Sequence, residues 1–525
     1  MAPRLLDLHG QPISADAIAR VRILAAAGAY VAAGANAQEL RDWSPLAGSP
    51  DADLDGDRTQ LLARARDLDR NDPLVAGAVQ SLKDTAIGFD LAFQAMPDYR
   101  GLGLTRDAVR DAANRIEDLW REWAEDRDCC DVTGQASFGQ MTRQAVHSDL
   151  TNGESLALAL WLPERQARLG SRFATVLQAI EPDRLGNPHL RPSDMRMRDG
   201  IEIDEFGAPV AYHVEQTHPG DQILLFAGPR RWERVPVRGP MGRRGVIQSF
   251  DQKRPGQHRG VSWLSPVMLQ IKQLNRMTRA ELQAAVLNAI IAMVLESPLD
   301  GSSLLDLFGS AEKFQSQRGQ AAPLQLGIGP GGVIPRLPPG EKLTGFASNR
   351  PNNAFDGFVV SVERMIAAGL GMTYETFTRD YSKTNYSSAR ASMLEGWRFI
   401  LFLRMHKALT WCRPVLELVI EEAVWRGYID LPGFETSRAA RRAWLRGLWR
   451  GPARGWVDPV KEIQAAAMRV RLGISTLRDE AMEQGRDLDD LLDQIELEQE
   501  ALKKRGLTLP DVDFTPAREV AIAAE

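Results

Sequence analysis

Hydrophobic residues recur with two different periods along this chain of 525 residues, and the change of period separates helical from β-rich segments. Apolar positions three and four residues apart predict helices over residues 59–69, 73–88, 105–124 and 137–150. From residue 154 the period becomes two, which predicts antiparallel strands. These strands are expected at 155–161, 173–180, 201–204, 210–215, 223–226, 232–237 and 246–250. The pattern therefore predicts an α+β fold.

The second half of the chain returns to helical spacing. Helices are predicted over 265–296 and 355–370, and residues 299–350 between them show no continuous period. A polar, turn-rich stretch follows, and a very long helix then begins at Ser387 or Ser388, either of which can cap it. Two helices that flank an irregular insertion thus lead into a polar loop and a third, longer helix.

Pro414 lies inside this long helix and predicts a kink near Cys412, because proline removes a backbone donor and clashes with the preceding turn. Short helices are expected afterwards, starting at Asp458 and near Ser475 and Asp487. Residues 1–56 are rich in Ala, Gly, Pro and Asp with weak periodicity, which predicts a flexible arm.

Two groups of basic residues are candidates for contact with a polyanion. Lys272, Arg276 and Arg279 follow one another at i, i+4 and i+7, which places them on one helix face. Taken alone, a solvated face is the more common outcome for such a stripe. Residues 438–456 combine arginines with tryptophans, which is compatible with nucleic-acid stacking or with an amphipathic helix that buries its tryptophans.

Composition excludes several classes of function. The formal net charge of −5 gives the whole chain no general affinity for nucleic acid. The three cysteines, Cys129, Cys130 and Cys412, lack any zinc-binding spacing, so reduced buried thiols are expected. The longest apolar run, over 284–295, is shorter than the roughly 20 residues that a membrane span needs. No cofactor is predicted, since the glycine-rich segment near residue 330 lacks the phosphate-binding pattern.

The acidic residues offer the one enzymatic alternative. Asp51, Asp53 and Asp55 resemble the start of a calcium-binding loop, but Leu62 stands where the closing glutamate would be required. A metal-dependent DNA-processing enzyme would need convergent carboxylates from the β-rich region, where turn-forming aspartates are the default interpretation. The candidates are Asp183, Asp194, Asp204, Glu205 and Asp221. We predict neither a catalytic nor a metal site.

Several segments carry a family resemblance. The most characteristic is AAGLGMTYETFTRDYSKTNYSSARASMLEGWR, which ends at Arg398. Others occur in a matching order: LDRNDPLVAGAVQSLKDTAIG, EPDRLGN, HPGD, PPGEK and GWVDPVKE. Over roughly residues 50–505 the chain resembles the lambda-type portal proteins of tailed bacteriophages. The resemblance implies a portal fold assembled as a ring, usually of about twelve copies.

The resemblance also implies a division of the chain. The expected parts are a flexible N-terminal arm (1–56), a mixed α/β wing (57–262), stem helices (263–296 and 352–371), an irregular clip (297–351), a tunnel-loop region (372–387), a long kinked helix with its return into the wing (388–457), a helical crown (458–505) and a tail (506–525). Residues Arg379, Lys383, Thr384 and Asn385 of the tunnel loop are then expected to face the channel, with Lys272, Arg276 and Arg279 lining it or bridging subunits.

The same resemblance implies the partners. Double-stranded DNA would pass through the channel during packaging and ejection, and the ATP-driven motor would be a separate terminase, because this chain has no nucleotide-binding motif. The capsid or scaffold protein and the head-completion proteins would bind the outside of the ring. The expected location is one vertex of the virion, reached by assembly in the cytoplasm of the bacterial host.

Overall fold

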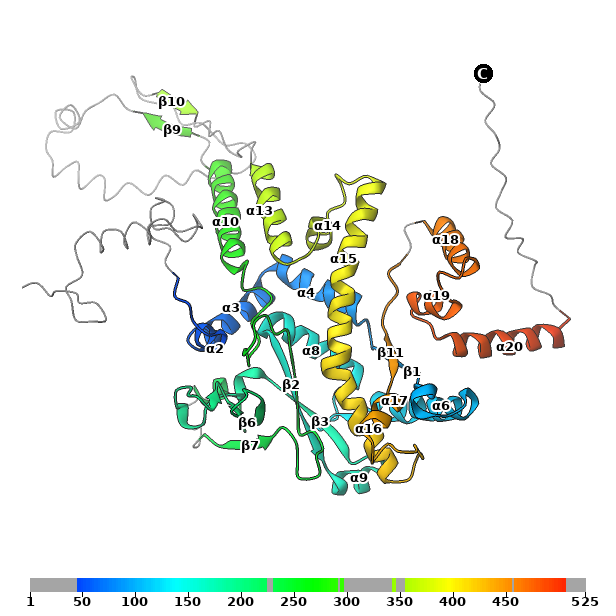
Figure 1. Cartoon of the computed structure of the whole chain (residues 1–525). Helices are drawn as coiled ribbons and strands as arrows, with labels where there is room; N and C mark the ends of the chain where they lie inside the picture. Colours follow the sequence, from blue (N-terminus) through cyan, green and yellow to red (C-terminus); the bar gives the residue numbers. More distant parts are fainter. Residues whose placement is uncertain are drawn as a thin grey trace, which may run out of the picture.

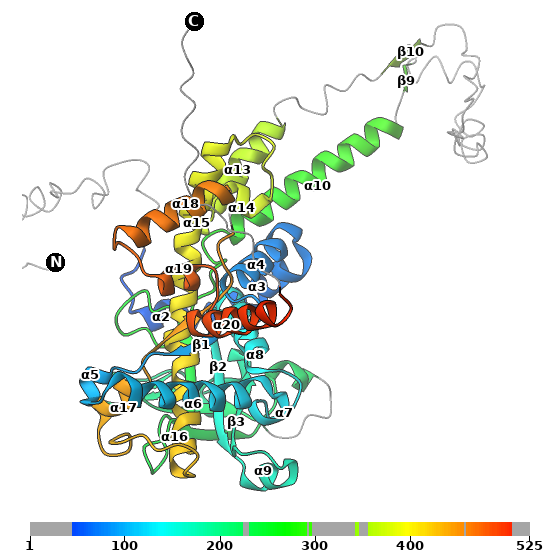
Figure 2. The same ribbon diagram turned by 90° about the vertical axis from the view of Figure 1, so that its right-hand side faces the viewer.

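The computed structural model describes residues 45–223, 230–290, 293–296, 342–345, 355–455 and 458–506. Figures 1 and 2 show a mixed body of helices and small sheets, with one long helix, α15 (Tyr386–Lys407), running along it. Helices α10 and α13 lie beside one end of α15, and the last helices of the chain lie to one side (Figure 1). The observed class is α+β, as the sequence predicts.

The first half contains eight described α-helices; the four longest form in the predicted places, and the four short ones were not predicted. In chain order the eight are α2 (Pro50–Asp55), α3 (Arg58–Asn71), α4 (Pro73–Ala86), α5 (Tyr99–Leu102), α6 (Arg106–Glu125), α7 (Arg127–Cys130), α8 (Phe138–Asn152) and α9 (Pro163–Leu169). Local chemistry fixes their starts: Asp72 accepts from the backbone N–H of Val75, and Ser137 with Gln140 forms a capping box at α8.

The strands make small antiparallel sheets. They are β1 (Ala92–Ala95), β2 (Glu154–Trp161), β3 (Thr175–Ile180), β4 (Met197–Arg198), β5 (Ile201–Ile203), β6 (Pro209–Glu215), β7 (Trp232–Pro236), β8 (Val246–Phe250), β9 (Met293–Glu296), β10 (Lys342–Gly345) and β11 (Gly447–Arg450). Their orders are β3-β2-β8, β4-β5-β6-β7, β1-β11 and β10-β9. The strand predicted at 223–226 is not among them: Ile223 ends a 3-10 turn, Pro219–Ile223, and 224–226 lie outside the described residues.

The remaining helices complete the chain. They are α10 (Met268–Ile290), α13 (Phe355–Gly369), α14 (Tyr374–Thr378), α15, α16 (Arg413–Trp425), α17 (Arg438–Trp444), α18 (Pro459–Arg471), α19 (Leu477–Glu483) and α20 (Leu488–Lys504). The apolar faces of α6, α8 and α16 meet in one core that contains Trp123, Phe138 and Trp411. By contrast, α18, α19 and α20 contain no buried residue.

Three sequence predictions need correction here. The helix predicted over 265–296 ends at Ile290, because residues 293–296 pair as β9 with β10, a partner about fifty residues away that periodicity does not reveal. The long helix starts earlier than predicted, since Asn385 is the cap. The predicted arm, 1–56, includes helix α2, which Leu54 anchors by burial. Residues 1–44, most of the predicted clip and 507–525 lie outside the described part.

A buried ionic cluster joins the helices to the β-rich region. The guanidinium of Arg259 lies 2.6 Å from Glu154 on β2 and 2.9 Å from Asp199, and both Arg259 and Glu154 are almost fully buried. Arg58 of α3 binds the same Asp199 at 2.5 Å. The paired charges fix α3 against the sheet, because removing one partner would leave another charge buried alone.

Candidate functional site

The polar loop between α14 and α15 holds four of the predicted site residues. It begins at Arg379, which is exposed and has a left-handed backbone with φ of 58°. Non-glycine residues rarely adopt this conformation, which here reverses the chain after α14. The Arg379 Nη2 donates to the backbone carbonyl of Gly77 in α4 at 3.3 Å. The loop is therefore attached to the body at its first residue.

Internal hydrogen bonds shape the rest of the loop. Asp380 accepts from the backbone N–H of Ser382, and the Ser382 donors hold the pKa of Asp380 below its usual value. The Thr384 hydroxyl donates to the carbonyl of Tyr381 at 2.8 Å. The Asn385 side chain accepts from Ser388 N–H at 2.8 Å, and so caps α15. Thr384 and Asn385 thus have structural partners, in the loop and in the first turn of α15 respectively.

Lys383 extends into solvent. Its side chain is 70% exposed, and its Nζ lies 3.5 Å from Asp356 at the start of α13, which is 83% exposed. An ion pair with this exposure is weak, about 0–1 kcal/mol. Lys383 is therefore held loosely and remains available to an external anion.

The second group of predicted residues lies on α10. Lys272, Arg276 and Arg279 are all exposed, on the face that the spacing predicts. Lys272 lies 3.8 Å from Asp67 of α3, whereas Arg276 and Arg279 have no ion-pair partner within the described ranges. Helix α13 stands between α10 and α14 (Figure 1). The basic residues of α10 and those of the loop after α14 therefore do not form a single patch within one subunit.

The long helix changes type where the kink is predicted. Residues Ala408–Cys412 form a π-helical turn, and Pro414 is the second residue of the α16 segment that follows. Just before this turn, Lys407 is fully buried with its Nζ 2.5 Å from Asp149 of α8. Burial lowers the pKa of the Lys407 ammonium and raises the pKa of the Asp149 carboxyl. The sequence did not single out this pair.

The tryptophan-rich segment is mostly structural. Trp444 is buried in α17 and donates to the carbonyl of Pro432. Trp449 lies on β11, where its ring centroid is 4.9 Å from that of Phe93 and 5.6 Å from that of Trp120. These rings are occupied by protein contacts, so they do not offer free faces for base stacking. The segment is a helix and a strand rather than one amphipathic helix.

Among the described residues, the acidic candidates Asp183, Asp194 and Asp204 are each engaged in protein contacts. Asp194 and Asp204 accept backbone N–H groups in their own turns. Asp183 is hydrogen-bonded to Arg66 and lies near Glu181 and His218, a grouping with suitable spacing for a cation. However, His218 Nδ1 accepts from Gly220 N–H, so its Nε2 carries the proton and faces Glu181 at 3.0 Å. Arg66 and this tautomer both disfavour a metal.

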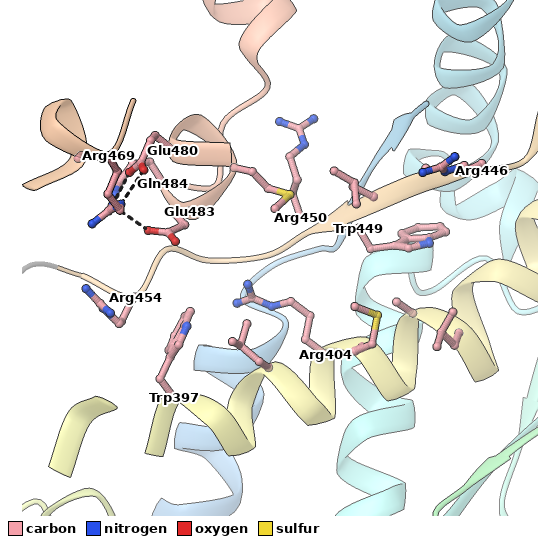
Figure 3. Close-up of a pocket in the computed structure, with 18 of the residues that line it drawn as sticks. Trp397, Arg404, Arg446, Trp449, Arg450, Arg454, Arg469, Glu480, Glu483 and Gln484 are labelled. Atoms are coloured by element: carbon pink, nitrogen blue, oxygen red, sulfur yellow. Dashed lines mark hydrogen bonds and ion pairs between the residues drawn. The ribbon is translucent and has the colours of Figure 1, made fainter. Parts of the chain in front are cut away.

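The structure contains one large groove that the sequence analysis missed. It lies between α15, β11, α18 and α19, and has a volume of about 1330 Å³ (Figure 3). Its floor is formed by Trp397, Leu401 and Met405 of α15 and by Leu409 of the π-helical turn that follows, which are spaced four residues apart. Leu401, Met405 and Leu409 are 45–60% exposed. The i, i+4 spacing of these residues was visible in the sequence, but the exposure of their side chains was not.

Arginines surround this apolar floor. Figure 3 shows Arg404 beside Trp397, and its guanidinium lies 5.3 Å from the Trp397 ring centroid while donating to backbone carbonyls. On the other side, Arg469 of α18 is held by Glu480 of α19. Among the described residues, Arg390, Arg413 and Arg442 of the lining have no ion-pair partner. The groove is therefore apolar at its centre and basic at its margins.

The sequence is also similar to that of known proteins. Residues 36–404 match the family model described as phage portal protein, lambda family. Portal protein B of Escherichia phage lambda is 33% identical over 488 residues, covering 90% of this chain and 89% of that protein. The portal protein of Escherichia phage N15 is 32% identical over 500 residues, covering 92% of each.

Solved structures give a more distant likeness. A chain from the neck of a native GTA particle, computed with C12 symmetry, is 14% identical with a TM-score of 0.42, covering 82% of this chain and 93% of that one. Separately, none of the helices in the described ranges is long and apolar enough to cross a bilayer.

Proposed function

We propose, from the premise that this chain belongs to the lambda family of phage portal proteins, that it is the subunit of a ring-shaped DNA channel at one capsid vertex. Double-stranded DNA would enter through this ring during packaging and leave through it during ejection. The observation that carries the proposal is the family match, which spans most of the chain at about one third identity.

The geometry supports a channel-lining role for one end of the subunit. Helices α10 and α13 lie side by side there, with the loop 379–385 next to them (Figure 1). Lys383, Arg276 and Arg279 are exposed cations without strong protein partners, which suits brief contacts with a passing polyanion. A ring of about twelve copies would repeat each of them around the channel. The assignment of 57–262 to the wing, 263–296 and 352–371 to the stem, 297–351 to the clip and 458–505 to the crown belongs to this proposal.

The remaining partners follow from the same role. Terminase would supply the ATP-driven motor and dock on the ring, the capsid or scaffold protein would surround it, and head-completion proteins would bind after packaging. The chain itself would be structural rather than catalytic. It would assemble in the host cytoplasm and remain in the virion.

A packaging experiment tests this function. The chain is co-expressed with the capsid and terminase proteins of its own genome, and DNase-protected DNA is measured in the particles formed. We expect protected DNA only when this chain is present. Equal protection in particles that lack the chain would overturn the proposal.

A further inference from the structure

Helix α20 is largely exposed in the described structure, and only Leu488, Asp489, Leu491 and Leu502 are partly covered. It contains no buried residue, and Figure 1 shows it directed away from α15. Most of its large apolar residues follow one face, with Leu497 on the other side: Leu488, Leu491, Leu492, Ile495 and Leu502. An amphipathic helix of this kind is stable when its apolar face is covered.

The charges of α20 are mainly negative. Between residues 488 and 502 it carries only acidic charges, at Asp489, Asp490, Asp493, Glu496, Glu498 and Glu500. Asp490, Asp493 and Glu496 have no ion-pair partner within the described ranges, while Asp489 binds Arg478 and Glu500 binds Lys504. The helix therefore presents an apolar face flanked by free carboxylates.

The groove beside α15 has the opposite character. Its apolar floor runs from Trp397 to Leu409, with unpaired Arg390 before it and Arg413 after it. The stretch from Trp397 to Arg413 rises about 24 Å, and the 17 residues of α20 span about 25 Å. Length, apolar surface and charge of the two elements therefore match.

A subunit's own α20 is directed elsewhere. Its first turn starts at the rim of its own groove, where the cap residue Asp487 lies 3.4 Å from Arg450. From that point the helix extends away from the body (Figures 1 and 2). This geometry leaves the groove open and makes α20 available to a neighbour.

We propose that the groove along α15 binds the α20 helix of the adjacent copy of this chain. The contact rests on the proposed ring and specifies one of its interfaces. Each subunit donates a helix to one neighbour and receives a helix from the other, which is the head-to-tail arrangement that closes a ring. Leu492 and Ile495 cover the apolar floor, and the free carboxylates face Arg390, Arg413 and Arg442.

Cysteine cross-linking tests this contact in the full-length chain. Leu492→Cys is combined in turn with Leu401→Cys, Met405→Cys or Leu409→Cys, and the samples are treated with a short bismaleimide. The native Cys129, Cys130 and Cys412 are buried, so we expect the bismaleimide to react with them slowly in the folded protein. Single-cysteine variants and Leu492→Cys with Glu395→Cys, an exposed residue of α15 that does not line the groove, are the controls.

We expect at least one groove variant to give a ladder of covalent multimers on denaturing gels, with the controls at least tenfold lower. If the ring is intact but no ladder forms, or if the cross-link forms only within one subunit, the proposed contact is wrong. The proposed ring would not be affected by either result. Absence of any ring would instead overturn the proposed function, and with it the contact.

Charge reversal gives a second, independent test. Asp490→Lys, Asp493→Lys and Glu496→Lys together should lower the fraction of assembled rings at least tenfold at low salt. Adding Arg390→Glu, Arg413→Glu and Arg442→Glu should restore assembly, because the pairing is kept with its signs exchanged. If the three lysine substitutions leave assembly unchanged, the contact is contradicted. It is also contradicted if the added glutamate substitutions fail to restore assembly in a chain that keeps wild-type helical content.

Discussion

The Lys383 ammonium lies 3.5 Å from the Asp356 carboxylate, and this pair links the loop before α15 to the start of α13. Both side chains are largely exposed, so water and salt screen their attraction. The loop therefore has a contact with the neighbouring helix that breaks at little cost. Under the proposed function, such a contact would let the loop change position as DNA passes.

Lys383→Ala should leave the folded subunit almost unchanged but reduce DNA retention. We expect the melting temperature to shift by no more than about 1 °C, because an exposed pair contributes about 0–1 kcal/mol. DNase-protected DNA in assembled particles should fall, and more so at low salt, where the lost attraction counts most. The matched control is Lys253→Ala, an exposed lysine in the β-rich region. Equal loss in both variants would contradict a role for Lys383.

The sequence predicted local structure well where one segment determines it. Caps such as Asp72, Ser137, Asp458 and Asp487 were readable, because each bonds to a backbone group two or three residues ahead. The strand at 293–296 was missed because its partner lies far along the chain.

The candidate site was predictable only in part. The exposure of Lys272, Arg276 and Arg279 followed from spacing. The Lys407–Asp149 pair and the groove along α15 depend on tertiary packing between distant segments, which no local pattern encodes.

The Lys407–Asp149 pair predicts a strong non-additive effect on stability. Lys407→Met should lower the free energy of unfolding by about 3–5 kcal/mol, because it leaves the Asp149 carboxylate without its cation. The double variant with Asp149→Leu should regain most of this loss, since neither charge is then buried. Urea denaturation of the two single variants and the double variant measures the coupling. Additive losses would show that the pair is not energetically linked.

The Asp51–His258 contact predicts a pH-dependent anchor for α2. His258 Nδ1 lies 2.7 Å from Asp51, and this hydrogen bond raises the pKa of His258. Burial of Asp51 opposes its ionisation, but the contacts with His258 outweigh it and lower the pKa of Asp51. The pair therefore stabilises the fold between about pH 4 and pH 6.5, and its contribution falls as pH rises through the raised His258 value.

Asp51→Asn should thus lower the melting temperature most near pH 5 to 6, with a smaller effect at pH 8. The control is Asp55→Asn, on the same helix but exposed. A pH-independent difference between wild type and Asp51→Asn would contradict the charged pair.

The raised pKa of Glu117 predicts a second pH-dependent effect on stability. Burial raises its pKa to about 7, while Ala95 N–H donates to its carboxyl at 2.7 Å. The folded state then holds a proton that the unfolded state loses near pH 4.5. The contribution of Glu117 to stability is therefore full below pH 4.5 and is lost as the pH rises through about 7.

Glu117→Gln keeps the acceptor for Ala95 but cannot ionise. Relative to wild type it should therefore become progressively more stable between pH 4.5 and about 7.5, in thermal melts recorded at each pH. Asp118→Asn, an exposed neighbour, should show no such trend. A Glu117→Gln difference that stays constant over this range would contradict the raised pKa.

We propose that this chain assembles into a ring around a DNA channel, and the mass and symmetry of the purified protein report on this assembly. Native mass spectrometry combined with single-particle imaging measures both. We predict a closed ring of about twelve subunits with a central hole. A compact monomer or dimer at all protein concentrations, with or without the capsid protein, would contradict the claim.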